Sequence, residues 1–147
     1  LAPSQALRDA WTAVDERIEA GDIAGAVELE LRMWVDGPGR TPEEVDRSVR
    51  ERVREMDAAL FAQPDEGEPQ PLDPPAAARL HEVAVPTLVL VGHRDQPDVL
   101  AGAETLAAGI PGARRAVIPN TAHLPNLERP AEFNRLVLEF LAGLDPS

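Results

Sequence analysis

The sequence contains no cysteine, lysine or tyrosine, and its only serines are Ser4, Ser48 and Ser147. The lack of cysteine excludes disulfides, thiolate metal ligands and cysteine nucleophiles. The lack of lysine excludes Schiff-base chemistry and a lysine general base. Long apolar runs are also missing: none approaches the roughly 18 residues that a membrane-spanning helix needs, so we do not expect a membrane protein.

Positive charge is scarce beside negative charge. The 147 residues include 26 acidic side chains and 14 arginines, which gives a formal net charge of −12. Because this charge repels phosphates, we expect no nucleic-acid partner. The sequence shows no basic-then-apolar leader segment, and we expect a cytoplasmic protein. It begins at Leu1 rather than at a methionine, so we expect it to be a piece of something longer.

The first half of the sequence has the apolar spacing of amphipathic helices. Apolar residues recur every three or four positions in three stretches, which predicts three helices with one apolar face each. The predicted stripes are Leu7, Trp11, Val14 and Ile18; Ile23, Val27, Leu31 and Trp34; and Val45, Val49, Val53, Met56 and Leu60. The sequence Thr41-Pro42-Glu43-Glu44 has the pattern of a capping box, so we predict that the third helix starts there.

The second half has a different pattern. Residues 63–75 are acidic and include five prolines, which predicts an exposed linker. The apolar run over 83–91, which ends at Gly92, is typical of a strand buried in a parallel sheet. After this strand the sequence predicts a helix, a second strand over 114–119 and a last helix that begins at Pro130. This order predicts a parallel βαβα unit with a right-handed crossover.

Two ionisable side chains follow the two predicted strands. Asp95 comes three residues after Gly92, and His123 follows the second strand. Ligands of open α/β sheets bind beyond the carboxyl ends of the strands. A carboxylate that fixes the tautomer of a histidine base is the supporting half of a nucleophilic triad. Taken singly, Asp95 could equally be a loop acid and His123 a surface histidine, but together they predict a catalytic pair.

The segments "VPTLVLVGHRD" and "IPGARRAVIPNTAHLPNLERPAEFN" resemble the carboxyl-terminal part of an α/β-hydrolase. In that family the triad acid follows a strand ending in Gly-x-x-Asp, and the histidine precedes an "LE.P..F" helix; the chain order is nucleophile, acid, histidine. The resemblance implies that Asp95 is the triad acid and His123 the triad base. It covers residues 83–144 in detail.

The resemblance also implies an α/β organisation. Residues 1–62 are similar in kind to the helical cap that many members insert before the acid-bearing strand. We therefore expect a cap over 1–62, the linker over 63–75, and over 76–147 a βαβα piece of the parallel α/β-hydrolase core.

The family's G-x-S-x-G nucleophile motif is absent from the sequence. None of the three serines stands in such a motif, and Asn120-Thr121-Ala122 precede the histidine where a glycine often stands. The resemblance is thus to a cap plus the last third of a hydrolase, and we expect the chain alone to be inactive. It implies no cofactor, and in the intact parent a small apolar substrate such as an ester, lactone or activated carbonyl compound.

Other residues of the sequence are candidates for a substrate pocket, a catalytic role or a metal site. Trp34, beside a Gly-Pro turn, is expected to pack the cap on the core or to line the substrate pocket. Asp98 opens a helix, where a cap is favoured over a catalytic role. His81, His93 and His123 lack the short spacings of a zinc site, so we predict no metal.

The sequence does not decide which subtype of α/β-hydrolase the chain resembles or which partners it binds. The lack of tyrosine argues against epoxide hydrolases, haloalkane dehalogenases are possible but not favoured, and "AHLPNLERPAEFN" is also similar to enol-lactone hydrolases and carbon–carbon bond hydrolases. An alternative from another class is a non-catalytic acidic helical protein-interaction module. Because a free edge of the strand over 87–91 would attract another strand, we expect a homo-oligomer or pairing with a missing N-terminal half.

Overall fold

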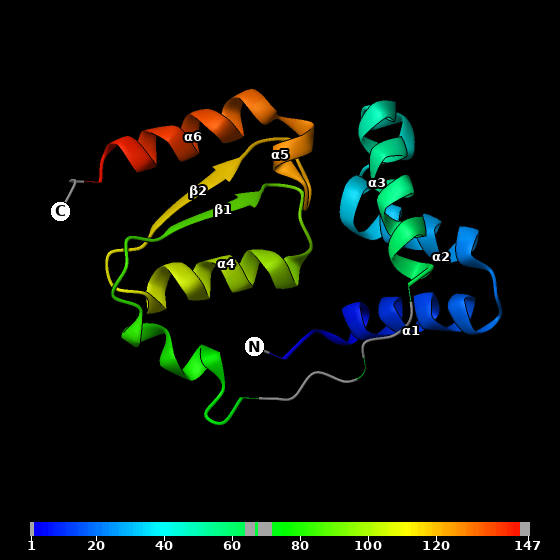
Figure 1. Ribbon diagram of the computed structural model, residues 1–147, viewed down its shortest axis with the longest axis horizontal. Coiled ribbons are helices and arrows are strands. Elements are labelled where there is room, and N and C mark those ends of the chain that lie inside the picture. The colour runs from blue at the N-terminus through cyan, green and yellow to red at the C-terminus, as the bar shows by residue number, and fades with distance from the viewer. Residues whose placement is uncertain (1, 64–66, 68–71, 145–147) are drawn as a thin grey trace.

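The computed structural model describes residues 2–63, 67 and 72–144, and its elements form two groups (Figure 1). The first group, here termed the cap helices, consists of α1 (Gln5–Glu19), α2 (Ile23–Glu30), the π-helical turn η1 (Leu31–Asp36), the 3₁₀ turn η2 (Pro42–Glu44) and α3 (Arg47–Phe61). The second group consists of the 3₁₀ helix η3 (Ala76–Glu82), β1 (Leu88–Gly92), α4 (Pro97–Gly109), β2 (Arg114–Ile118), α5 (Pro125–Glu128) and α6 (Pro130–Ala142). Among the described residues, no helix combines the length and the apolar character needed to cross a bilayer.

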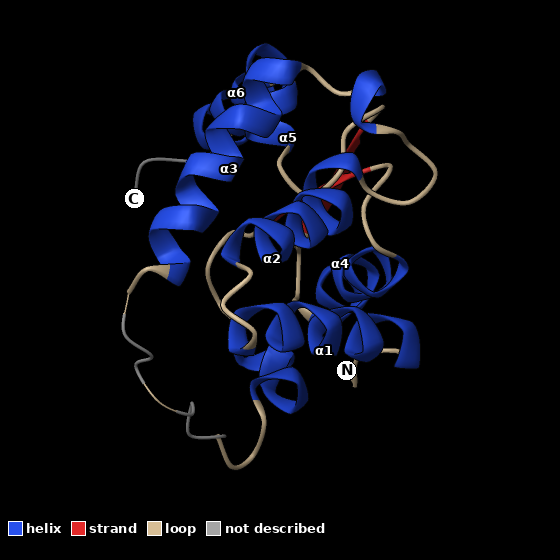
Figure 2. Cartoon of the chain, turned by 90° about the vertical axis from the view of Figure 1, so that its right-hand side faces the viewer, coloured by secondary structure: helices blue, strands red, loops and turns tan. Residues whose placement is uncertain are grey.

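The two strands form a parallel pair, with Leu88 opposite Arg114 and Gly92 opposite Ile118. Helix α4 connects them, and α4 and α6 lie on opposite sides of the pair (Figure 1). Both strands point towards the cap helices, and Figure 2 views the molecule from that side, with the strands behind the helices. This confirms the predicted α/β fold class, a helical layer followed by a βαβα unit.

Strand β1 is shorter than the predicted strand. The apolar run starts at residue 83, but β1 begins only at Leu88. Pro86 has no amide hydrogen to donate to a neighbouring strand, and the side chain of Val85 is 66% exposed. The run before Leu88 is therefore a surface connection. The predicted boundaries at 62/63 and 75/76 stay predictions, and most of the predicted linker, 64–66 and 68–71, lies outside the described residues.

The predicted capping box is present, but it caps a short 3₁₀ turn and not the third α-helix. The Glu44 carboxylate accepts a hydrogen bond from the Thr41 amide at 2.7 Å, but the pair closes only the 3₁₀ turn η2. Val45 is then extended, and α3 begins after Asp46, whose side chain accepts from the Ser48 amide. The predicted start of the third helix was therefore wrong by several residues.

The core of the cap helices surrounds Leu31, which is fully buried. It packs with Val27 and Val35, with Val45, which follows η2, and with Val49 and Val53 of α3. The predicted buried stripe of the third helix was wrong beyond Val53, because Met56 and Leu60 are 51% and 60% exposed. Phe61, and not Leu60, contacts this core at the end of α3.

Strand β1 has an open edge. In the part of the chain that the structure describes, the sheet contains only β1 and β2, so β1 has one neighbour. An unpaired strand edge is a template for another strand. We therefore expect the chain to self-associate at micromolar concentration, and static light scattering measures this. A monomer at that concentration would contradict the prediction.

Candidate functional site

The site lies where the loops that follow the two strands meet. Gly92 ends β1, and a Cβ atom at this position would lie 1.9 Å from the Ala122 carbonyl oxygen and 2.5 Å from that of Thr121. The absence of a side chain thus lets the histidine loop, residues 119–123, cross directly over the end of β1. The Arg94 amide donates to the Thr121 carbonyl at 2.8 Å, which joins the aspartate loop to the histidine loop.

A second glycine brings the cap helices to the same place. Gly37 follows η1 with a φ of +70°, a conformation that favours glycine. A Cβ atom here would lie 2.4 Å from the Arg94 carbonyl oxygen and 2.8 Å from the Ala122 Cβ atom. The turn after η1 therefore lies against both loops of the site. Asn120, in the histidine loop, also has a positive φ, +57°, a conformation that asparagine tolerates better than most residues.

The two residues predicted to form a catalytic pair are in contact. His123 Nδ1 lies 2.9 Å from Asp95 Oδ2 and 3.2 Å from Oδ1. The Asp95 side chain is buried, and Oδ1 also accepts from the Gln96 amide at 2.8 Å. Because the carboxylate accepts from Nδ1–H, the other ring nitrogen, Nε2, is the one that can take up a proton. This arrangement can perform general base chemistry.

The electrostatics of the pair favour the protonated ring. The hydrogen bond that the ring donates to Asp95 raises the pKa of His123 above its ordinary value, while partial burial of the ring works in the opposite direction. The His123 side chain remains 44% exposed, so the ring can be reached from outside. A buried carboxylate behind an accessible imidazole is the arrangement that stabilises a transient imidazolium.

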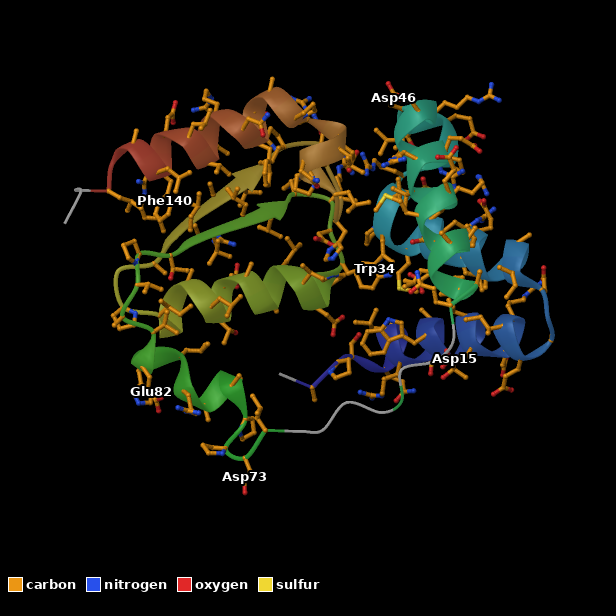
Figure 3. The ribbon with its side chains drawn as sticks, viewed as in Figure 1. Asp15, Trp34, Asp46, Asp73, Glu82 and Phe140 are labelled. Atoms are coloured by element: carbon orange, nitrogen blue, oxygen red, sulfur yellow. The ribbon has the colours of Figure 1, made fainter. Side chains whose placement is uncertain are left out.

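Trp34 contacts His123 in two ways. The ring centroids lie 4.7 Å apart with planes inclined by 46°, and the Trp34 carbonyl accepts from the His123 amide at 3.0 Å. Figure 3 shows Trp34 between the cap helices and the ends of the strands. It also lines a cavity of about 300 Å³ together with Trp11, Leu7 and Val99. Trp34 thus both packs the two groups of elements together and borders a cavity.

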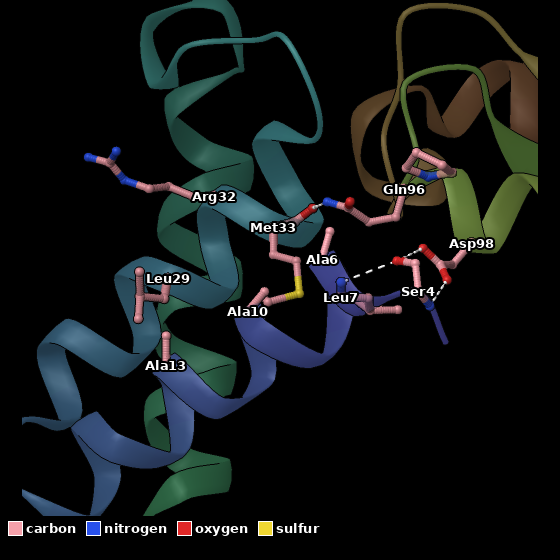
Figure 4. A pocket seen from close by; sticks show the side chains of 11 residues that line it. Ser4, Ala6, Leu7, Ala10, Ala13, Leu29, Arg32, Met33, Gln96 and Asp98 are labelled. Atoms are coloured by element: carbon pink, nitrogen blue, oxygen red, sulfur yellow. Dashed lines mark hydrogen bonds between the residues drawn. The ribbon is translucent and has the colours of Figure 1, made fainter. Parts of the chain in front are cut away.

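A second, mostly apolar cavity of about 520 Å³ lies between the cap helices and the start of α4 (Figure 4). Gln96 crosses one side of it and donates from Nε2 to the Met33 carbonyl at 2.6 Å. Asp98 does not cap α4, whose N-cap is Gln96; its carboxylate instead accepts from the amide and hydroxyl of Ser4 at 2.6 and 2.7 Å. Asp98 therefore ties the start of the chain to α4.

Two residues that contact the histidine loop or its neighbours were not predicted from the sequence. Glu128 Oε1 accepts from the Ala122 amide at 2.6 Å, and Arg40 Nη1 lies 2.7 Å from Glu128 Oε2. Both side chains are only 8% exposed. Glu128 stands in the "LE.P..F" pattern, which could have drawn attention to it, whereas no local signal marks Arg40.

No described serine hydroxyl is directed to His123. Ser4 Oγ donates to Asp98, and Ser48 Oγ donates to Asp46. Ser147 lies outside the described residues. Among the described residues there is also no group of three or more histidine, aspartate or glutamate side chains that could hold a metal ion.

Comparison with known proteins identifies the fold. No protein-family model matches the chain. Over 68 residues, 46% of the chain, it is 38% identical to 2-hydroxy-6-oxononadienedioate/2-hydroxy-6-oxononatrienedioate hydrolase 2 of Pseudomonas putida. The solved structure of a hydrolase from Pseudomonas aeruginosa PA01 matches 97% of the chain at 29% identity, with a TM-score of 0.64. MGS-M2, an alpha/beta hydrolase enzyme from a Medee basin deep-sea metagenome library, matches 98% of the chain at 18% identity, with a TM-score of 0.66. The chain has the α/β-hydrolase fold over the part of that fold that it spans.

The chain spans only part of the proteins that it matches. The matched region covers 24% of the P. putida hydrolase, 52% of the P. aeruginosa hydrolase and 54% of MGS-M2. The family resemblance found in the sequence is therefore confirmed, over a part of the α/β-hydrolase fold.

Proposed function

We propose that the chain is the acid- and base-bearing part of an α/β-hydrolase that acts on a small ester, lactone or activated carbonyl compound. The observation that carries the proposal is the 2.9 Å contact between Asp95 and His123 Nδ1 at the carboxyl ends of parallel strands. The similarity to a P. putida hydrolase of a 2-hydroxy-6-oxo dioate supports the activated-carbonyl class.

In this mechanism His123 acts as general base and then as general acid. Its Nε2 takes the proton from a serine hydroxyl, supplied by a segment that is not in this sequence, as the hydroxyl oxygen attacks the carbonyl carbon. The same proton then goes to the leaving group as its bond to the carbonyl carbon breaks. Asp95 holds the ring in the required tautomer and stabilises the imidazolium. The cavity beside Trp34 accommodates an apolar part of the substrate.

Reading the gene upstream of the Leu1 codon tests the proposal. We expect a G-x-S-x-G sequence after a predicted strand in the same frame. The longer product should hydrolyse p-nitrophenyl esters or lactones, and His123→Ala should abolish this activity. Translation that starts at Leu1 would instead favour an acidic helical protein-interaction module.

The chain as given is expected to be catalytically silent. Among the described residues, both serine hydroxyls donate to carboxylates other than Asp95, so neither serves His123 as a nucleophile. We expect hydrolysis of p-nitrophenyl acetate to be no faster than with the same concentration of free imidazole, measured by release of p-nitrophenol. His123→Ala is the control, and a large rate that this substitution removes would contradict the prediction.

A further inference from the structure

The helix formed by α2 and η1 ends in four consecutive carbonyl groups that face the site. The last carbonyls of a helix have no donor within it and need hydrogen-bond donors from elsewhere. Here the carbonyl of Met33 accepts from Gln96 Nε2 at 2.6 Å and that of Trp34 from the His123 amide at 3.0 Å. The carbonyls of Val35 and Asp36 accept from Arg40 Nη2 and Nε at 2.7 and 2.6 Å.

Arg40 connects this helix end to the histidine loop. Besides its two bonds to η1, Nη1 donates to the Asn120 carbonyl at 3.0 Å and to Glu128 Oε2 at 2.7 Å. Nη2 also lies 3.2 Å from Glu128 Oε1, so each N–H donor of the guanidinium group has an acceptor. A planar, fully bonded and buried fork of this kind fixes the relative position of the groups that it joins.

Glu128 completes the connection. Its Oε1 atom accepts from the amide of Ala122, the residue before His123, at 2.6 Å. Arg40 and Glu128 therefore hold the main chain on the amino-terminal side of His123, while the Trp34 carbonyl holds the His123 amide itself.

We infer that Arg40 and Glu128 are positioning residues, which keep the His123 ring on Asp95 by fixing the histidine loop to the last turn of the cap helix. Their importance for catalysis rests on the proposed function, because it requires that His123 is the base. Their effect on the ring itself does not depend on any reaction, and it can be measured on this chain alone.

The decisive variant removes both charges together. Arg40→Met alone would leave Glu128 buried and unpaired, which destabilises a fold for reasons unrelated to His123. The double variant R40M/E128M removes one positive and one negative charge, so the direct electrostatic effects on His123 offset each other. What remains is the loss of the bonds that hold the loop.

The experiment is an NMR titration of His123 in the full chain. In R40M/E128M we expect the His123 pKa to fall towards its ordinary value and the Nδ1–H resonance to be lost to faster exchange with water. The matched control is R54M/E28M, which removes another oppositely charged pair of the cap helices, between α2 and α3, with Arg54 Nη1 3.3 Å from Glu28 Oε2. It should lower stability but leave the His123 titration unchanged.

A conservative variant covers the case in which the double variant does not fold. Arg40→Lys keeps the charge beside Glu128 but loses the fork, so we expect a smaller downward shift of the His123 pKa. An unchanged titration in R40M/E128M, or in Arg40→Lys where the double variant does not fold, would overturn the inference, and so would an equal shift in R54M/E28M. Failure to find hydrolase activity in the longer gene product would overturn the proposed function and leave this inference intact.

Discussion

Substitution of Gly92 by alanine is expected to lower the free energy of unfolding by about 3 kcal/mol. The added Cβ atom would lie 1.9 Å from the Ala122 carbonyl oxygen and 2.5 Å from the Thr121 carbonyl oxygen. Both obstacles are main-chain atoms, so no side-chain rotation can make room, and the histidine loop must lift from the end of β1. Urea denaturation followed by circular dichroism measures the change.

Gly143→Ala is the matched control for this substitution. Gly143 has a φ of −85°, and the nearest atoms to its added Cβ would lie 3.4 and 3.5 Å away, at ordinary contact distance. This variant should stay within about 0.5 kcal/mol of the native chain. If Gly92→Ala were equally stable, the close crossing of the two loops would be refuted.

Replacement of Asp95 by asparagine is expected to bring the pKa of His123 down to its ordinary value near 6.5 or below. The hydrogen bond that the ring donates to Asp95 is the main cause that raises this pKa, and the burial that opposes it would remain. Two-dimensional NMR of the imidazole resonances measures the shift. In the longer enzyme, loss of the correct tautomer should also reduce kcat by about four orders of magnitude.

The same variant predicts a pH dependence of stability. A histidine whose pKa is raised in the folded state stabilises that state fully below the unfolded pKa, near 6.5. This contribution is lost as the pH rises through the raised pKa of the folded state. The stability difference between the native chain and Asp95→Asn should therefore shrink over that interval. Asp98→Asn is the control, since its carboxylate contacts Ser4 and not the imidazole, and a pH-independent difference for Asp95→Asn would contradict the assignment.

The central pair of the site could be predicted from the sequence because its signals are local. An apolar strand that ends in glycine places Asp95, and the next strand places His123; parallel topology then brings both to one edge. The structure adds the contact itself, at 2.9 Å, and the tilted Trp34 ring beside it.

The supporting contacts could not be predicted, because they depend on distant parts of the chain. Arg40 and Glu128 are 88 positions apart, and nothing in the "LE.P..F" pattern around Glu128 indicates Arg40 as its partner. The exposure of Met56 and Leu60 likewise depends on which turns of α3 the core around Leu31 reaches, and helical periodicity alone does not contain this information.

The main-chain bond from His123 to the Trp34 carbonyl has a consequence for how this hydrolase part could open. A cap that swung away from this edge as a lid would break that bond and the bond from Gln96 to Met33 in the same motion. Movement of η1 and the position of His123 are therefore mechanically linked. Under the proposed function, a substrate that enters without moving η1 meets an ordered base, whereas one that needs a wider entrance must first break these bonds.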